Sequence, residues 1–243
     1  MTINRPEALN ALNSALLHDL RETLARLARE EDSGAVILTG GGDAFIAGAD
    51  IKEMRSKSVL EARTYGALGQ ECADMLETMH KPTLAAINGY ALGGGLELAL
   101  GCDIRYASTR AKLGQPEVNL GIIPGWGGTQ RLARIAGIGF AKELILTGRT
   151  IDAKEAQRHG LITALFEPAE LLPRTLELAQ ELAEKSPLAL AYAKEATNRA
   201  LHGDLGANLA EEVNLFSILF STEDAKEGLD AFMEKRGPGF VGH

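Results

Sequence analysis

The chain has 243 residues, of which 45% are hydrophobic and 24% charged, a composition ordinary for one large globular domain or a main domain with a smaller appendage. Its 33 acidic and 25 basic side chains give a formal net charge of −8, which argues against a protein that binds nucleic acid mainly through phosphates. No run approaches ~18 uninterrupted apolar residues, and the opening "MTINRPEALN" lacks the pattern of a signal peptide, so we expect no membrane span and a cytoplasmic location.

The first two-thirds of the chain is predicted to alternate short strands with helices. Leucines at three- and four-residue spacing predict an amphipathic helix over residues 14–30, capped by Asn13 or Ser14. "AVILTG" (35–40) reads as a buried strand, and the glycine-rich segments 40–51 and 88–95 read as loop and turn. Further strands are predicted over 83–87 and 103–108, and further helices over 59–79, 96–102, 128–136 and 140–148. This alternation is typical of an α/β fold.

After Glu167 the pattern changes. Residues 169–235 read as consecutive helices, with breaks at 185–187, 202–204 and 221–224, and contain no convincing strand. We therefore expect a boundary near residue 168, between an α/β core (1–168) and a helical C-terminal module (169–243).

The two cysteines, Cys72 and Cys102, stand in apolar surroundings 30 residues apart. No CxxC pair or His/Cys cluster accompanies them, so the sequence favours small core residues over a disulfide or a zinc site. The five histidines are scattered and none is assigned a catalytic role. "GGGDAF" lacks the ending of a P-loop, and "LGGGLELAL" lacks the third glycine of a dinucleotide fingerprint.

Glu97 is the one charged residue in "NGYALGGGLELALGC" (88–102). An acidic residue in the first turn of a helix is favoured by the helix dipole alone, and this plain explanation is at least as good as catalysis for the stretch by itself. The preceding glycines favour a functional role. Gly94 and Gly95 would let a ligand approach the backbone, and free N–H groups at a helix start can stabilise an oxyanion beside a carboxylate that moves protons.

Glu117 is the only charged residue between positions 113 and 130. Alone, it would be read as an exposed turn residue after Pro116. Together with Glu97, it suggests a general acid/base pair whose pKa values are pushed apart by burial and mutual repulsion, although glycosidases also use paired carboxylates. "PGWGGTQRL" (124–132) is a further glycine-rich helix entry, which either simply caps a helix or aims more backbone donors at the same cavity.

These motifs resemble the enoyl-CoA hydratase/isomerase (crotonase) family. The resemblance runs through "NRPEALNAL", "AFIAGADIKEM", "KPTLAAINGYALGGGLELALGCDIRYAS", "LGQPEVNLGIIPGWGGTQRL", "LTGRTIDAKEA" and "STEDAKEGLDAFMEKRGPGF", nearly the whole chain in order. It is closest to the short-chain enoyl-CoA hydratases, because both family glutamates are present. It implies a spiral core of β-β-α repeats and a helical trimerisation module. It also implies a hexamer of two stacked trimers that binds acyl-CoA thioesters and needs no metal or redox cofactor.

The resemblance assigns roles to individual residues. The oxyanion-hole amides fall on Ala49 and Gly94, Glu97 activates water for attack on the β-carbon, Glu117 delivers a proton to the α-carbon, and the Gly125 amide helps to hold the water. Ala47, Ala49, Asp50, Ile51 and Lys52 belong to the segment that would line the adenine and pantetheine of CoA. Gly94 would also contact the substrate, and Lys235 would reach towards a neighbouring subunit's CoA site. A solvated lysine is an equally good reading of Lys52.

Two features depart from the family pattern. Only "MTI" precedes "NRPEA", where members usually carry a longer opening strand, so we expect a shortened sheet edge. Ile46 and Trp126 stand where smaller residues are common, and Trp126 is expected to reshape the acyl pocket.

The resemblance implies reversible hydration of a trans-2-enoyl-CoA to a 3-hydroxyacyl-CoA. Three alternatives stay open: an enoyl-CoA isomerase, a methylglutaconyl-CoA hydratase-like enzyme, and a non-catalytic or RNA-binding relative. Retention of two glutamates favours hydration over isomerisation, and the negative net charge gives no support to RNA binding.

Overall fold

The computed structural model describes residues 1–243. The strands are β1 (Thr2–Ile3), β2 (Val36–Gly40), β3 (Ala44–Ile46), β4 (Thr83–Ile87), β5 (Tyr90–Leu92), β6 (Ile104–Ser108), β7 (Lys112–Gly114), β8 (Thr150–Asp152) and β9 (Ala164–Phe166). The helices are α1 (Ser14–Arg29), α2 (Ile51–Met54), α3 (Val59–Thr78), α4 (Gly94–Gly101), α5 (Gly128–Ala136), α6 (Ile138–Thr147), α7 (Ala153–Arg158), α8 (Pro168–Ala183), α9 (Pro187–Arg199), α10 (Leu205–Leu219) and α11 (Glu223–Glu234). Two short 3₁₀ helices, η1 (Pro6–Ala8) and η2 (Glu117–Leu120), complete the chain.

The strands form two sheets, and the chain alternates between them in a repeating order. The larger sheet has the order β1-β2-β4-β6-β9 and is parallel throughout. The smaller sheet has the order β3-β5-β7-β8, in which only β8 is antiparallel. Three times the chain gives one strand to the large sheet, the next to the small sheet, and then a helix. This β-β-α repeat confirms the predicted α/β spiral.

Helices cover the sheets because their apolar residues fall on one side. Helix α1 buries Leu17, Leu20 and Leu24 and packs against α3, and Asn13 caps it by accepting the N–H of Leu16. Helix α4 is buried along its whole length and contacts α3, α5, β3 and β5, so it is the central helix of the core. Cys72 and Cys102 are buried free thiols in this core, as predicted.

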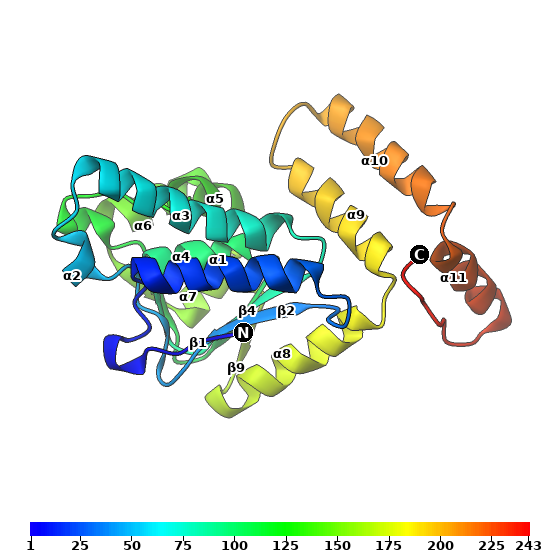
Figure 1. The fold of residues 1–243 in the computed structure, drawn as a ribbon, viewed down its shortest axis with the longest axis horizontal. Helices are drawn as coiled ribbons and strands as arrows, with labels where there is room; N and C mark the ends of the chain where they lie inside the picture. The colour runs from blue at the N-terminus through cyan, green and yellow to red at the C-terminus, as the bar shows by residue number, and fades with distance from the viewer.

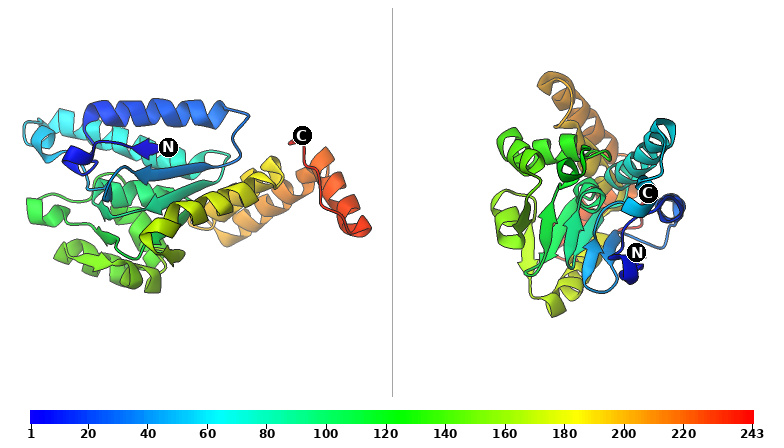
Figure 2. Two further views of the ribbon diagram at one scale, coloured as in Figure 1. Left: turned by 90° about the horizontal axis from the view of Figure 1, so that it is seen from below. Right: turned by 90° about the vertical axis from the view of Figure 1, so that its left-hand side faces the viewer.

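The chain is helical after β9. Helix α8 packs against β2, β4, β6 and β9, whereas α9, α10 and α11 project from the body of the sheets (Figures 1 and 2). Every residue of α10 is at least partly exposed. None of the helices combines the length and hydropathy needed to cross a membrane. The division of the chain into two units at residue 168 stays a prediction.

The sequence analysis named only β2, β4 and β6 as strands and missed the shorter ones, of which β3, β5 and β7 position the site. Segment 40–51 contains β3, segment 88–95 contains β5, and β7 was not predicted at all. Each has three residues, too few to show an alternating pattern, and each lies beside glycines. They form strands because they pair with one another and because Ala44, Phe45 and Ile46 are buried. Helix α4 also begins at Gly94, two residues earlier than predicted.

Candidate active site

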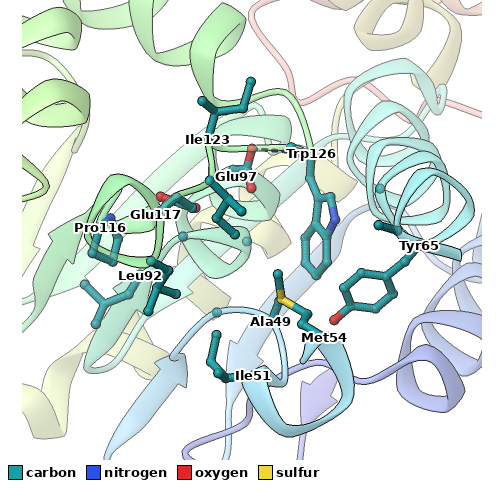
Figure 3. A pocket seen from close by; sticks show the side chains of 18 of the residues that line it. Ala49, Ile51, Met54, Tyr65, Leu92, Glu97, Pro116, Glu117, Ile123 and Trp126 are labelled. Atoms are coloured by element: carbon teal, nitrogen blue, oxygen red, sulfur yellow. Dashed lines mark hydrogen bonds between the residues drawn. The ribbon is translucent and has the colours of Figure 1, made fainter. Parts of the chain in front are cut away.

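The candidate site lies where the three parallel strands of the small sheet end. Segment 47–49 follows β3, segment 93–94 follows β5, and segment 115–117 follows β7. Neighbouring strands are about 4.8 Å apart, so these segments meet at one edge of the sheet. A cavity of about 420 Å³ opens there, with Glu97 and Glu117 both directed into it (Figure 3).

Most of the residues predicted for the site line this cavity. They are Ala47, Ala49, Ile51, Gly94, Glu97, Glu117 and Gly125. The remaining walls are largely apolar, contributed by Met54, Tyr65, Leu92, Leu120, Ile122, Ile123 and Trp126. An apolar cleft with a few convergent polar groups is typical of a site for a small organic substrate.

Two backbone donors bind the carboxyl group of Glu97 and favour its ionised form. Its Oε1 accepts the N–H groups of Trp126 and Gly128, each at 2.7 Å, and the residue is only 2% exposed. Burial raises its pKa, whereas the two N–H donors and the nearby Arg131 guanidinium act in the opposite direction. Two backbone donors of "PGWGG" thus point at Glu97, which agrees with the reading in which this segment serves the cavity.

Glu117 is placed to carry a proton. It is the first residue of η2, and burial, with a further contribution from the charge of Glu97, raises its pKa to about 7. Its own backbone N–H opposes this shift. The amide nitrogen of Gln115, when turned towards Glu117, donates to both carboxylate oxygens at 2.9 and 3.1 Å and also favours the ionised form. Both members of the pair thus titrate above their ordinary range, as expected for buried acids.

Three backbone amides are available to a ligand at this cavity. The N–H groups of Ala49 and Gly125 donate to no group in the chain. Gly94 is the first residue of α4, so its N–H has no acceptor within the helix. Ala49 and Gly94 belong to neighbouring strand ends, which is the arrangement needed for two donors to meet one oxygen.

The three glycines before Glu97 are explained by protein contacts more than by ligand approach. Gly93 has φ +51, and an added Cβ would lie 2.7 Å from Glu117 Oε1. At Gly94 an added Cβ would lie 2.2 Å from Trp126 Cζ3, and at Gly95 it would lie 2.0 Å from the Ile46 carbonyl oxygen. Neighbouring protein groups fill the space that a side chain at Gly94 or Gly95 would need, and the approach of a ligand to their backbone stays a prediction.

Three residues predicted to bind CoA do not line the cavity in this chain. Asp50 caps α2 by accepting the N–H groups of Lys52 and Glu53, and its Oδ2 pairs with Arg5 at 2.6 Å. That hydrogen bond is the main reason for its lowered pKa. Lys52 is exposed on α2, and Lys235 ends α11, at the opposite end of the molecule from α2 (Figure 1). Their CoA-binding roles stay predictions.

Four site residues were missed by the sequence analysis. Gln115 contacts Glu117, and Tyr65 packs edge-on against Trp126, with ring centroids 5.4 Å apart. Gln70 and Arg131 bond the backbone behind the cavity. Gln115 could have been noticed as an uncharged polar residue two positions before Glu117. Tyr65 and Gln70 carry no local signal, because helix α3 meets the "PGWGG" segment only in the folded chain. Arg131 lies within "PGWGGTQRL", but its residue type alone does not show that it contacts the Trp126 carbonyl.

Comparison with known proteins agrees with this geometry. The enoyl-CoA hydratase/isomerase family matches residues 1–243. A short-chain-enoyl-CoA hydratase of Clostridium acetobutylicum is 48% identical, over 97% of this chain and 91% of the relative. A crotonyl-CoA hydratase of Syntrophomonas wolfei is 46% identical, over 98% and 92%. The crystal structure of an enoyl-CoA hydratase from Bacillus anthracis superposes with a TM-score of 0.96 at 42% identity, covering 100% of this chain and 94% of that one. The chain therefore belongs to the enoyl-CoA hydratase/isomerase family.

Proposed function

We propose that this protein is an enoyl-CoA hydratase that adds water reversibly to short trans-2-enoyl-CoA thioesters. The observation that carries the proposal is the presence of two buried carboxylates, Glu97 and Glu117, in one cavity with the unpaired amides of Ala49 and Gly94. The relatives named as short-chain-enoyl-CoA and crotonyl-CoA hydratases support the reaction and the substrate class.

The two acids divide the proton chemistry. The Glu97 carboxylate, held ionised by the Trp126 and Gly128 amides, takes a proton from water as the water oxygen bonds to the β-carbon. The Glu117 carboxyl gives its proton to the α-carbon. The Gly125 amide helps to orient the water. In the reverse direction the same groups exchange roles.

The amides of Ala49 and Gly94 stabilise the charge that builds on the thioester oxygen. As the water adds, the carbonyl takes on enolate character, and its oxygen becomes a stronger acceptor than in the substrate. Each preorganised donor of this kind contributes on the order of 3 kcal/mol to lowering the barrier.

The test is the loss of conjugated enoyl-thioester absorbance when purified protein meets crotonyl-CoA. Glu97→Gln and Glu117→Gln should each lower kcat by a factor of ~10² or more while the fold is retained. Full activity in both variants would contradict the assigned roles. Double-bond rearrangement of a 3-enoyl-CoA, without hydration of crotonyl-CoA, would identify an isomerase instead.

We further propose that copies of this chain assemble through the C-terminal helices, as a dimer of trimers. Support comes from large apolar side chains exposed on α10 and α11, notably Phe216, Phe220, Phe232 and Met233. Such an assembly would bring Lys235 of one copy nearer to the cavity of another. Light scattering of the purified protein measures its mass, and a monomer would refute the proposal. The cytoplasmic location stays a prediction.

A further inference from the structure

The "PGWGG" segment is fastened to helix α3 on the side that faces away from the cavity. Gln70 on α3 donates its side-chain amide to the Gly125 carbonyl at 2.9 Å. Arg131 donates to the next carbonyl, that of Trp126, at 3.2 Å. Arg131 is itself anchored to α3, where it pairs with Glu77 at 2.7 Å and with Asp74. Two consecutive carbonyls are thus held by side chains that belong to, or are fixed by, one helix.

Peptide geometry couples these outer contacts to Glu97. In a planar trans peptide the C=O and the following N–H point in opposite directions. The peptide that joins Gly125 to Trp126 presents its C=O to Gln70 and its N–H to Glu97 Oε1, at 2.7 Å. Gln70 and the catalytic carboxylate therefore lie on opposite sides of the same peptide plane.

Arg131 fixes the next peptides in the same way. Its guanidinium holds the Trp126 carbonyl, and its backbone N–H donates to the Gly127 carbonyl at 2.9 Å. Gly127 has φ +109, a conformation that turns the following N–H, that of Gly128, towards Glu97 Oε1. A side chain at position 127 would collide with the Arg131 guanidinium, which shows how closely the arginine is packed against this turn.

We propose that Gln70 and Arg131 are positioning residues for the catalytic base, which hold the 125–128 turn so that its amides meet Glu97 and the Gly125 amide stays directed at the water. This inference rests on the proposed hydratase function and extends it to residues outside the cavity. Neither side chain touches substrate; both act through the backbone of the turn.

The groups around Glu97 predict a change in the pH dependence of activity, and this change can be measured. Arg131 favours the carboxylate of Glu97, and two further charged residues, Glu117 and Lys57, line the same cavity. Loosening the turn weakens the Trp126 and Gly128 hydrogen bonds, which are the main opposition to the effect of burial on the Glu97 pKa. That pKa then rises further, and the base becomes protonated, hence inactive, at a higher pH than in the parent protein.

The experiment compares Gln70→Leu and Arg131→Gln with the parent protein in steady-state hydration of crotonyl-CoA between about pH 5 and pH 9. We expect kcat to fall roughly tenfold in each variant, a barrier increase of about 1.4 kcal/mol, with KM nearly unchanged. The acidic limb of the kcat profile should move to higher pH. Arg131→Lys keeps the positive charge. Compared with Arg131→Gln, it should return the acidic limb of the profile towards that of the parent protein more fully than it returns kcat.

Two matched controls lie on the same helix as Arg131. Gln130, whose side-chain amide donates only to the neighbouring Thr129 hydroxyl, is changed to Leu, and the exposed Arg134 is changed to Gln. Both should keep the parent kcat and pH profile. Because Gln70 is exposed, Gln70→Leu should also keep the parent unfolding temperature, which separates positioning from stability.

Two results would overturn the inference while leaving the proposed function intact. One is that the parent protein hydrates crotonyl-CoA and that both variants have the same kcat and the same acidic limb as the parent. The other is an equal loss of kcat in the two controls. A well-folded parent protein that leaves crotonyl-CoA unchanged would instead refute the proposed function, and with it the role given to Gln70 and Arg131.

Discussion

Glu117 should lower the stability of the folded protein at alkaline pH, and its replacement by glutamine should remove that penalty. The carboxyl is 9% exposed, and its pKa of about 7 in the folded protein compares with an ordinary value of 4.5. An acid that is harder to ionise in the folded state than in the unfolded state opposes folding wherever it must carry its charge.

The size of the penalty follows from the two pKa values. At about 1.4 kcal/mol per pH unit, the gap between them corresponds to about 3 kcal/mol. Below about pH 4.5 the group is protonated in both states and the penalty vanishes. It grows between about pH 4.5 and pH 7 and is complete above that range. Donation from Gln115 favours the ionised form, so about 3 kcal/mol is an upper bound.

The assay is urea unfolding of the parent and Glu117→Gln proteins at about pH 5 and about pH 9, at equal protein concentration. The glutamine variant should gain up to ~3 kcal/mol relative to the parent between the two pH values, although it loses hydratase activity. Glu31→Gln, at an exposed position without an ion pair, is the control and should show no such gain. A stability difference between parent and Glu117→Gln that does not change with pH would refute the burial argument.

Four further outcomes are expected. Because Glu117 must carry the proton that it donates, kcat/KM for hydration should fall about tenfold per pH unit above about pH 7; a flat alkaline limb in a pH–rate profile would contradict this role. Gly94→Ala places a Cβ 2.2 Å from Trp126 and should displace the proposed oxyanion amide, so kcat/KM with crotonyl-CoA should drop by a factor of ~10²; an unchanged kcat/KM would contradict the role of this amide. Trp126→Ala should destabilise the protein by ~3–5 kcal/mol in urea unfolding, because the 4%-exposed indole fills the space between Gly69, Gly94 and Tyr65. The same variant should shift the ratio of kcat/KM values towards enoyl-CoA substrates longer than crotonyl-CoA, and an unchanged ratio would show that the indole does not limit the acyl chain.

The large-scale organisation was predictable from the sequence because it depends on long, strongly patterned segments. The leucine spacing of α1 and the apolar runs of β2 and β4 are local signals, and the structure confirms them with ends shifted by one residue or less. The two isolated glutamates were also recognisable, because a lone charge in an apolar, glycine-rich stretch needs a partner or a function when buried.

What could not be predicted is the set of contacts that only the folded chain creates. Strands β3, β5 and β7 exist through pairing with one another, and the small sheet that they form sets the positions of the site segments. Gln70 lies 27 positions before Glu97 and 61 before Arg131 in the sequence. Gln70 and Arg131 support Glu97 through backbone carbonyl groups, which every residue has, so the residue types do not reveal these contacts. Asp50 shows the converse case, since a motif position associated with the ligand turned out to cap a helix and pair with Arg5.

The oxyanion donors proposed at Ala49 and Gly94 belong to the main chain, and their positions follow from two hydrogen-bonded strands of the small sheet. Only substitution by proline, which has no backbone N–H, would delete such a donor, whereas any uncharged substitution deletes the charge of an arginine or a lysine. The proton-handling groups, by contrast, are two ordinary side chains that a single codon change can replace. In a scaffold of this kind, the backbone donors proposed to bind an activated thioester are retained, while the acid–base side chains, and with them the reaction, can change during evolution.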